Sequence, residues 1–473
     1  MEHFLLPHGR PEPDDQISRA NRHIFGNTTF RTNQRDAIQT TLNRQDVFVL
    51  MPTGGGKSLC YQLPAVLSKG VTIVVSPLLS LIQDQVTSLV RNKPAGIPAA
   101  YLSSQTAVKL LKAVLRDLHR PVPTIKLLYV TPEKLASSSS LISLLEDLNR
   151  RVRSYRKDLE TNTLAVYAQE MLARFVVDEA HCVTQWGHDF RPDYNKLGRL
   201  KELFPDVPVM ALTATAPQKV IDSVKKVLKI PRATVFTMSF NRTNLRYEYQ
   251  RDQHHRTGHL AHVLLSFDVL EKENEESKAL AQLHAYISSK YANNVVGIVY
   301  CMTKQQSEDV ANYLFDRGIQ ADFYHAGQSS TDREMVQEAW QDGQIKVVCA
   351  TIAYGMGIDK ADVRYVLHYS VAKSIEGYYQ EAGRAGRDGQ PSQCTIFYNR
   401  RDVSKIRGII NMPKKGNTMK TRGVHMEKLE RMMEYCEERA SCRRQFLVSY
   451  FGQTFNRKDC KKTCDNCRRV IAH

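Results

Sequence analysis

Several features are scarce or missing in this chain of 473 residues, and each absence excludes a class of protein. No segment approaches the roughly 18–20 uninterrupted apolar residues of a membrane-spanning helix. The first fifteen residues have neither the basic segment nor the small-residue cleavage site of a secretory signal, so none is predicted. Ten cysteines are too few for a disulfide scaffold. Six of them are scattered, mostly in apolar segments, as in a reduced intracellular protein: Cys60, Cys182, Cys301, Cys349, Cys394 and Cys436.

Charge of one sign is present in excess. Lysine and arginine number 66 against 49 aspartate and glutamate, which gives a formal net charge of +17. Residues 400–473 contain 19 basic and 8 acidic residues, so +11 of this charge falls in the last sixth of the chain. A basic excess favours a polyanionic partner, whereas an evenly spread excess is usually only a solvated surface. The uneven distribution therefore directs attention to the C-terminal tail.

Composition and patterning predict an α/β protein. A hydrophobic fraction of 42% is ordinary for a globular chain, and at about 150 residues per domain the length suggests three domains. Short β-branched runs alternate with amphipathic helical stretches, which indicates parallel sheets buried on both faces. Two such series follow each other, so we predict two doubly wound domains with a cleft between them. The predicted strands are 46–52, 71–77, 125–132, 174–180 and 207–216, then 295–301, 321–327, 345–351, 363–370 and 394–399.

Two stretches interrupt this alternation. Residues 136–172 are predicted to form a serine-rich loop and then a basic amphipathic helix, and residues 269–285 an acidic helix near the domain junction. We interpret both as surface insertions. After residue 400 the apolar strands stop, and a helical, basic, cysteine-bearing tail begins.

The segment MPTGGGKS (51–58) lies between a predicted strand and a predicted helix. Its consecutive glycines allow backbone N–H groups to approach a phosphate closely, with Lys57 on the β- and γ-phosphates and Ser58 on Mg²⁺. The strict G-x₄-G-K-[ST] pattern fails, because its first glycine would fall at Met51. A glycine-rich turn that closes a strand is therefore a serious alternative for this segment alone. The residues predicted to bind the nucleotide here are Thr53, Gly54, Gly55, Gly56, Lys57 and Ser58.

A second predicted strand ends in two adjacent carboxylates, in the segment VVDEAH (176–181). Asp178 is placed to hold Mg²⁺ and Glu179 to orient or deprotonate an attacking water. An Asp-Glu pair is also common at a helix N-terminus, where the helix dipole favours it. With a phosphate loop upstream, the pair predicts a site that hydrolyses ATP.

A third element, QEAGRAGRDG (380–389), lies in the second series. Arg384 and Arg387 are three residues apart, so we predict that they share one helical face. Across a cleft they would neutralise charge on the γ-phosphate in the transition state, although alone the motif would be a solvated basic turn. Together the three elements predict a nucleotide bound between two domains, whose closure and opening drive relative domain motion.

In this order the motifs resemble those of superfamily 2 DNA helicases of the RecQ family, over about residues 25–467. MPTGGGKS, DEAH, ALTATA, ATIAYGMGIDK and QEAGRAGRDG are similar to helicase motifs I, II, III, V and VI. The resemblance implies RecA-like domains in which Arg387 is the arginine finger, Arg384 assists it and Gln380 lies near the γ-phosphate.

Two further segments carry the same resemblance. FGNTTFRTNQ (25–34) is similar to the motif that recognises adenine, which implies that Gln34 hydrogen-bonds the base and Arg31 stacks on it. MSFNRTNL (238–245) is most similar to the eukaryotic Bloom-type members of the family.

The most family-specific segment is CVTQWGHDFRPD (182–193), directly after DEAH. Trp186 and Phe190 offer stacking faces for bases, and Arg191 offers a phosphate contact. A core position for Trp186 is the alternative, but one of only two tryptophans in a polar loop beside the carboxylates favours the DNA role. The resemblance implies that this aromatic-rich loop couples single-strand DNA binding to hydrolysis through Gln185, Trp186, His188, Phe190 and Arg191.

The C-terminal cysteines have spacing suited to a tetrahedral zinc site, with ligands Cys442, Cys460, Cys464 and Cys467. The final C-x₂-C pair is a strong signal, whereas spacing alone leaves Cys436 in competition with Cys442 for the first ligand. The resemblance favours Cys442. Four thiolates imply a structural Zn²⁺ with no open position. Basic residues flank the site and predict a metal-braced surface that grips the DNA backbone: Arg443, Arg444, Arg457, Lys458, Lys461, Lys462, Arg468 and Arg469.

The predicted domains are 1–243 and 244–400, both RecA-like, and a zinc-binding subdomain, 401–473. We expect an ATP- and Mg²⁺-dependent DNA helicase that moves 3′→5′ on single-stranded DNA. Its expected substrates are branched or tailed duplexes in recombination, repair or replication, its location the nucleus, and no membrane is involved. Six residues follow Cys467, so the winged-helix and HRDC domains of many RecQ members are not expected here. The alternatives are a DEAD/H-type RNA helicase and an ATP-regulated DNA-binding or strand-annealing module.

Overall fold

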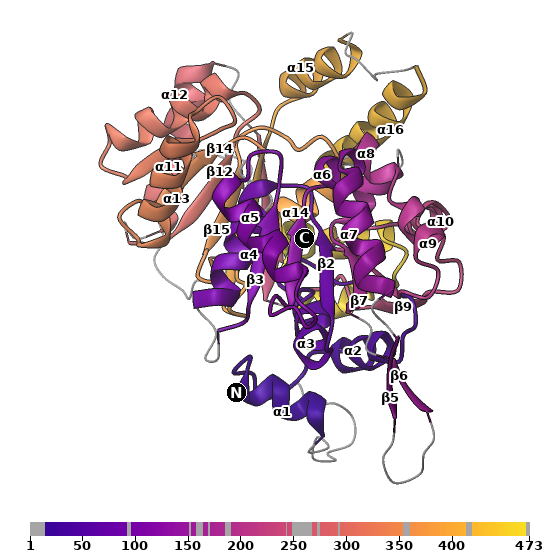
Figure 1. The fold of residues 1–473 in the computed structure, drawn as a ribbon. Helices are drawn as coiled ribbons and strands as arrows, with labels where there is room; N and C mark the ends of the chain where they lie inside the picture. Colours follow the sequence, from indigo (N-terminus) through magenta and orange to yellow (C-terminus); the bar gives the residue numbers. More distant parts are fainter. Residues whose placement is uncertain are drawn as a thin grey trace.

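The chain is described by a computed structural model that covers residues 15–91, 96–150, 153–157, 164–168, 171–184, 191–242, 244–247, 267–271, 275–291, 294–352, 360–412 and 419–469. Over these residues it contains two parallel seven-stranded sheets with helices around them (Figure 1). The predicted α/β class with two doubly wound domains is confirmed. Within the same ranges, no helix combines the length and the apolar character needed to cross a bilayer.

The first sheet has the strand order β3-β4-β2-β7-β8-β1-β9. Alternate residues of β1 pack into different apolar clusters, with Phe48 and Leu50 in one and Val47 and Val49 in the other, so both faces of the strand are buried. The strands are β1 Val47–Leu50, β2 Val71–Val75, β3 Ala99–Leu102, β4 Leu127–Val130, β7 Leu172–Val177, β8 Val209–Thr213 and β9 Thr234–Thr237. The helices of this part are α1 Gln16–His23, α2 Gln34–Leu42, α3 Leu59–Leu67, α4 Leu79–Arg91, α5 Val108–Leu118, α6 Pro132–Ser137, α7 Ser139–Arg150, η1 Ala180–Val183, α8 Pro192–Asn195, α9 Gly198–Leu203 and α10 Gln218–Val227.

The second sheet has the order β10-β16-β15-β12-β14-β13, and β11 also pairs with β16. Its central strands β12, β14 and β15 are wholly buried, as continuous apolar runs require in a parallel sheet. The strands are β10 Leu245–Tyr247, β11 Phe267–Glu271, β12 Gly297–Tyr300, β13 Ala321–Tyr324, β14 Val347–Ala350, β15 Tyr365–His368 and β16 Ser392–Tyr398. The helices are α11 Glu276–Lys290, α12 Lys304–Phe315, α13 Ser330–Gln341 and α14 Ile375–Ala382.

A helical module follows the second sheet, as predicted for the basic tail. It packs on the second domain through α14, where Lys428 forms a buried ion pair with Glu376 at 3.0 Å. The helices of the module are α15 Arg400–Asn411, α16 Met419–Glu437, α17 Arg443–Tyr450, η2 Arg457–Cys460 and α18 Asp465–Arg469.

The prediction for residues 136–172 is wrong for the serine-rich loop and partly right for the amphipathic helix, which is present as α7 but ends at Arg150. The serine run starts a helix: Ser138 Oγ accepts a hydrogen bond from Leu141 N, and leucines spaced three and four apart bury one face of α7. Beyond Arg150 the predicted helix does not continue, and an antiparallel hairpin of β5 Arg153–Lys157 and β6 Leu164–Ala168 projects from the body in Figure 1. Tyrosine and valine in these two short segments favour a strand.

The prediction for residues 269–285 is also partly wrong. The helix α11 begins only at Glu276, and Phe267–Glu271 pairs in parallel with β16 as strand β11. The edge of β16 provides the pairing partner for β11, and no local pattern in the sequence predicts this pairing.

Candidate nucleotide site and cysteine cluster

The phosphate loop and the carboxylate pair lie at the same edge of the first sheet. β8 lies between β1 and β7, with Leu50 opposite Thr213 and Val177 opposite Ala211. The loop follows the end of β1 and Asp178 follows the end of β7. The carboxyl ends of parallel strands share one edge of the sheet. Ser58 and Asp178, which are 120 positions apart in the chain, are therefore brought to the same edge.

The phosphate loop has the backbone that close approach to an anion requires. Gly54 and Gly56 have φ of +77° and +82°, a region that residues with a side chain rarely adopt. A Cβ atom added at Gly56 would lie 2.3 Å from Gln34 Nε2, so a side chain would also collide. In this state Lys57 Nζ donates to the carbonyls of Met51 and Pro52, at 3.1 and 3.4 Å.

The charge of Lys57 is influenced by charged residues of both domains. Burial lowers the pKa of this ammonium, the carboxylates of Glu179 and Asp178 oppose that shift, and the nearby Arg387 adds to it. Lys57 belongs to the first domain and Arg387 to the second, and their positive charges repel each other. An anion between them would relieve the repulsion, which is the electrostatic setting of a phosphate site.

Burial raises the pKa of Asp178 to about 7, and the adjacent Glu179 carboxylate adds to the effect while Lys57 opposes it. Glu179 N donates to Asp178 Oδ1 at 3.0 Å, and Glu179 itself has a left-handed backbone with φ of +48°. Such strain in a residue with a side chain persists where the surrounding structure enforces it. His181 Nδ1 lies 3.3 Å from Glu179 Oε2 and 2.9 Å from Thr213 Oγ1, which links the carboxylates to the end of β8.

Gln34 and Arg31 are bonded to the phosphate loop itself. Gln34 Nε2 donates to Gly56 O at 3.0 Å, and its Oε1 accepts from Arg31 N at 2.7 Å. The Arg31 guanidinium donates to Gly54 O. Both ends of the Gln34 amide are therefore engaged, and an adenine ring would have to compete for them.

The second domain contributes an arginine turn, defined here as residues 383–388. The predicted helical face is wrong: α14 ends at Ala382, and Arg384 and Arg387 lie in the turn that follows. Gly383 caps the helix, and Gly386 with φ of +59° cannot continue it. Both arginines nevertheless line the same cavity as the phosphate loop, and Arg387 Cγ lies 3.4 Å from the position of a Cβ at Gly54.

A cavity of about 400 Å³ between the two domains brings most of the predicted residues together. Its wall contains Phe25 and Asn27 near Gln34, and Ala361 and Gln380 from the second domain. The predicted site residues that line it are Arg31, Gln34, Thr53, Gly54, Gly56, Lys57, Ser58, Asp178, Glu179, Gln380, Arg384 and Arg387.

The aromatic-rich loop is only partly described. Gln185, Trp186, His188 and Phe190 lie outside the described residues. Arg191 is described, and its Nη1 donates to the carbonyl of Pro77 at 2.6 Å, next to the end of β2.

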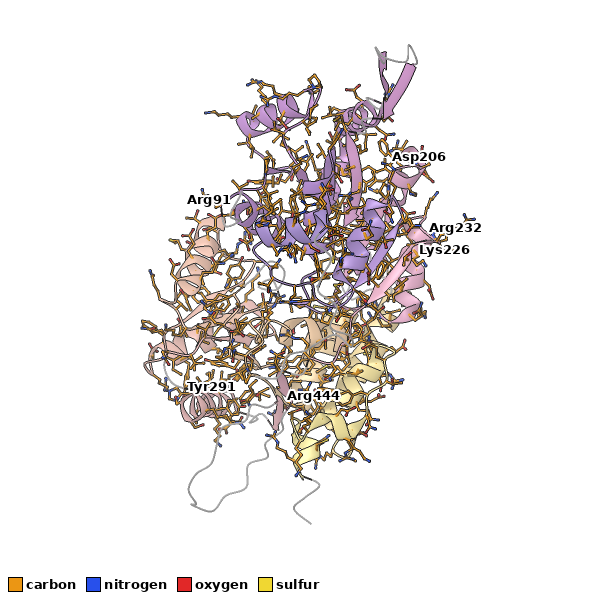
Figure 2. All side chains as sticks on the ribbon, turned by 90° about the horizontal axis from the view of Figure 1, so that it is seen from below. Arg91, Asp206, Lys226, Arg232, Tyr291 and Arg444 are labelled. Carbon is orange, nitrogen blue, oxygen red and sulfur yellow. The ribbon has the colours of Figure 1, made fainter. Side chains whose placement is uncertain are left out.

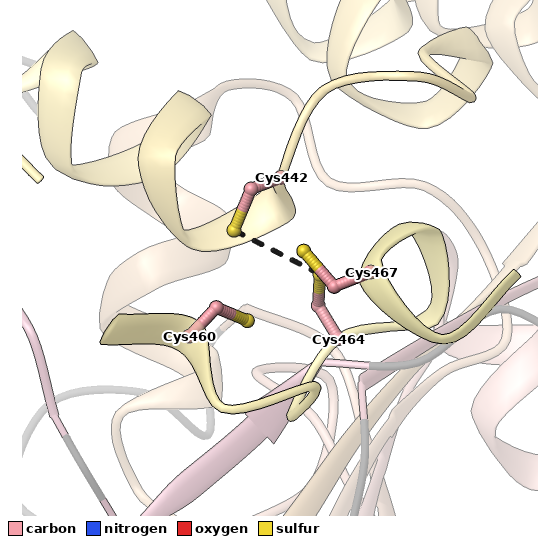
Figure 3. A group of neighbouring side chains, drawn as sticks. All are labelled: Cys442, Cys460, Cys464 and Cys467. Carbon is pink, nitrogen blue, oxygen red and sulfur yellow. Dashed lines mark hydrogen bonds between the residues drawn. The ribbon is translucent and has the colours of Figure 1, made fainter. Parts of the chain in front are cut away.

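Four cysteines of the C-terminal module converge, as Figure 3 shows. All four are buried, and their sulfur atoms lie within 4.8 Å of one another, with Cys464 Sγ and Cys442 Sγ 3.9 Å apart. A tetrahedral zinc with Zn–S bonds of about 2.3 Å needs sulfurs about 3.8 Å apart, so the set fits a Zn²⁺ site. The choice of Cys442 over Cys436 agrees with this cluster, in which Cys436 takes no part. The converging residues are Cys442, Cys460, Cys464 and Cys467.

Two of the basic residues near this cluster are buried. Arg443 and Arg444 are 1% and 3% exposed, so the sequence-based expectation that they form part of a DNA-gripping face is wrong. Arg443 pairs with Asp465, and Arg444 bonds the segment that connects the two domains. Adjacent arginines can be buried when each finds fixed acceptors, which spacing alone does not reveal.

The sequence-based reasoning missed several residues of this site. Tyr194 donates from its hydroxyl to Asp178 O at 3.1 Å, and Arg242 donates to the carbonyls of both the phosphate loop and the arginine turn. Arg242 lies in MSFNRTNL, a segment noticed only for its resemblance. The position of Arg242 next to the predicted domain boundary was the signal that could have indicated a role between the domains.

Two RecA-like domains that share a phosphate-binding cavity define a helicase-type motor. The DEAD/DEAH box helicase family matches residues 31–224, and the helicase conserved C-terminal domain matches residues 277–389. The fold is similar to the helicase MrfA bound to DNA and AMPPNP, with a TM-score of 0.59 at 16% identity over 98% of this chain and 61% of that one. Yeast Dbp5 bound to RNA and ADP BeF3 gives a TM-score of 0.57 at 15% identity, over 87% of this chain and 97% of that one. At such identities these likenesses show the fold alone.

The RecQ zinc-binding family matches residues 400–468. RecQ-like DNA helicase BLM of Xenopus laevis is 46% identical over 98% of this chain and 31% of its own length. ATP-dependent DNA helicase Q-like 4B of Arabidopsis thaliana is 42% identical over 94% and 36%, and ATP-dependent helicase SGS1 of Saccharomyces cerevisiae is 39% identical over 97% and 28%. The chain belongs to the RecQ family of helicases. It spans about a third of the length of these relatives.

Proposed function

We propose that the chain is an ATP-dependent DNA helicase that moves 3′→5′ along single-stranded DNA. The observation that carries the proposal is the shared cavity, in which Lys57 and the two carboxylates of the first domain face Arg384 and Arg387 of the second. A nucleotide in this cavity contacts both domains, so its binding and hydrolysis change their relative position. The names of the relatives, several of which are DNA helicases, support DNA as the track.

In the first domain, the backbone donors of residues 53–56 surround the phosphates and Lys57 neutralises their charge. Ser58 and Asp178 would hold Mg²⁺, whose charge would further neutralise the β- and γ-phosphates. Glu179 orients the attacking water and takes its proton, and its link to His181 fixes the direction of the carboxylate.

In the second domain, Arg387 acts as the arginine finger on the transferring phosphoryl group, with Arg384 assisting and Gln380 near the γ-phosphate. Arg31 and Gln34 bind adenine after exchanging their present contacts with the phosphate loop.

We also propose the predicted division into 1–243, 244–400 and 401–473. β9 belongs to the first sheet and β10 to the second, which supports a boundary near residue 243. The aromatic-rich loop couples DNA to hydrolysis, the branched or tailed substrates belong to recombination, repair or replication, and the location is the nucleus.

The test is unwinding of a duplex with a 3′ single-stranded tail, measured with and without ATP and Mg²⁺. We expect strand separation only with both, and none from a duplex with a 5′ tail. Lys57→Ala should lower ATP hydrolysis by about a hundredfold or more, because phosphate charge loses its main counter-charge. Lys69→Ala, an exposed lysine just beyond α3, is the matched control and should hydrolyse ATP normally.

Two alternatives are distinguished by the same assay. Stronger stimulation of hydrolysis by single-stranded RNA than by DNA would favour an RNA helicase. Hydrolysis and strand annealing without unwinding would favour an annealing module and contradict the proposal.

A further inference from the structure

The segment that connects the two domains also contacts the C-terminal module. Gln453 of the module donates to Met238 O at 3.2 Å and accepts from Phe240 N at 2.8 Å. The buried Phe240 ring stacks on Phe451 of the module, with centroids 4.4 Å apart and an interplanar angle of 13°. Tyr379 of α14 donates to Phe240 O at 2.7 Å. The connecting segment thus contacts both the module and the helix that leads into the arginine turn.

Arg242 in this segment donates to four backbone carbonyls from two domains. Its Nη1 donates to Gly383 O at 2.6 Å and to Thr53 O at 3.3 Å, and its Nη2 to Ala385 O at 3.1 Å and Gly386 O at 2.8 Å. Three of these acceptors belong to the arginine turn and the fourth to the phosphate loop. One planar guanidinium therefore fastens the turn to the loop, a geometry that a lysine ammonium cannot reproduce.

The arginine turn is also held by its own domain. Gly386 N donates to Val363 O at 2.9 Å, Asp388 N donates to Ala361 O at 3.3 Å, and Arg364 pairs with Asp388 at 2.6 Å. From the connecting segment, Asn244 Nδ2 donates to Gly386 O at 2.8 Å and to Gln390 O at 3.2 Å. Arg242 bonds both the turn and the phosphate loop, so the placement of the turn against that loop depends in part on Arg242.

Arg444 of the C-terminal module holds Arg242 in place. Its Nη1 donates to Arg242 O at 2.7 Å and to Asn241 Oδ1 at 2.9 Å, and its Nε donates to Thr463 Oγ1 at 2.9 Å. Thr463 in turn donates to Cys460 O at 2.6 Å, inside the cysteine cluster. Figure 2 labels Arg444 where the yellow C-terminal ribbon meets the rest of the molecule. A continuous set of hydrogen bonds thus runs from the cysteine cluster to the arginine turn.

We propose that Arg242 is a positioning residue for ATP hydrolysis and that the C-terminal module sets it through Arg444. The module then has a role at the ATP site in addition to any contact with DNA. The inference rests on the proposed function, in which Arg387 acts on the γ-phosphate. Arg242 does not line the cavity between the domains, and it acts by keeping the arginine turn at the distance that the transition state requires.

The kinetic test measures ATP hydrolysis at saturating single-stranded DNA for Arg242→Lys, Arg387→Ala and the double variant. Arg242→Lys should lower kcat by about tenfold or more, with the KM for ATP changed less than about threefold, because only the transition-state contact is misplaced. In the Arg387→Ala background the same substitution should have less than about a threefold effect, since only the assisting Arg384 is then left to be misplaced. Multiplicative effects of the two substitutions would overturn the inference.

The link to the module is tested with Arg444→Met in the whole chain, with zinc content confirmed. Amide hydrogen exchange of residues 383–389 should speed up at least about tenfold, because the turn loses its anchored partner. This readout needs no hydrolysis, so it decides the inference even if the unmodified chain fails to hydrolyse ATP and the proposed function falls. Unchanged exchange in the turn would overturn the link.

Arg439→Met is the matched control, since it removes the same charge from an exposed position in the same module. It should leave both kcat at saturating DNA and exchange in the turn unchanged. An equal fall in kcat for Arg439→Met and Arg444→Met would mean that charge, and not the Arg242 contact, is responsible, and would contradict the proposal.

Discussion

Arg443 and Asp465 form a buried ion pair with two parallel contacts, Nε to Oδ1 at 3.0 Å and Nη2 to Oδ2 at 3.1 Å. Their side chains are 2% and 0% exposed. Arg443 directly follows Cys442 and Asp465 directly follows Cys464, and Arg443 also donates to Tyr435 O. The pair therefore joins the two halves of the cysteine cluster through α17, α18 and the end of α16.

Asp465→Asn should destabilise the module by about 3–5 kcal/mol, because it leaves the Arg443 guanidinium buried without its counter-charge. Chemical denaturation of the zinc-loaded chain, followed by a probe in the module, measures the change. Arg443→Met combined with Asp465→Leu should be less destabilising than Asp465→Asn alone, since both buried charges are then removed. The exposed pair Arg431–Glu434 on α16 is the control, and Glu434→Gln should change stability little.

Cys442→Ala should abolish stoichiometric zinc binding, whereas Cys436→Ala should retain it. Four thiolates fit the tetrahedral spacing and Cys436 lies outside the set, with burial raising the pKa of its thiol to about 12. Zinc analysis of the purified variants measures this. Loss of zinc from Cys436→Ala with retention in Cys442→Ala would reverse the assignment.

Chelation of the metal should unfold the module and, through Arg444, loosen the arginine turn. The expected signs are loss of helical signal from residues 400–469 and faster exchange of residues 383–389. Unchanged hydrogen exchange of residues 383–389 in the chelated chain would mean that the metal does not influence the ATP site.

Trp186→Ala should spare basal ATP hydrolysis and abolish unwinding, because the base-stacking face that couples the two is removed. Hydrolysis without DNA and unwinding of a 3′-tailed duplex are measured side by side. Phe315→Ala is the control, since this aromatic is 65% exposed on the second domain. An undiminished unwinding rate in Trp186→Ala would contradict the coupling role.

DNA affinity should fall steeply with salt, and part of that dependence should come from the C-terminal module. Lys458, Lys461 and Lys462 are exposed beside the cysteine cluster. Replacing all three with alanine should reduce the slope of log affinity against log salt by about 2, since each phosphate contact on single-stranded DNA contributes about 0.7. An unchanged slope would exclude these lysines from the DNA contact.

Much of the fold was predictable because its signals are local. All ten predicted strands are present, and their apolar runs are as buried as a parallel sheet requires. The errors fall where local patterns are ambiguous. The serine run that we predicted to be a loop begins a helix after Ser138. Residues 267–271 form the strand β11 and not part of a helix, because β16 provides a pairing partner.

Most of the candidate site was also predictable, because the three motifs together indicate one site although each has other uses when it stands alone. The roles of Lys57, Asp178 and Arg387 remain predictions, but their meeting in one cavity follows from strand order. The helical face proposed for Arg384 and Arg387 was wrong because Gly383 and Gly386 end the helix, an effect of backbone conformation that residue spacing does not contain.

The order of residues alone specified the two α/β series, the phosphate loop, the carboxylate pair and the zinc spacing, because each depends on neighbours within a few positions. The tertiary structure decided which arginines are exposed and which are buried and bonded within the protein. Arg242 and Gly383 are 141 residues apart and Arg444 and Arg242 are 202 apart, so their hydrogen bonds exist only after both sheets and the module have packed. A guanidinium is solvated or structural according to the carbonyls that packing places around it, and that arrangement is a property of the folded chain.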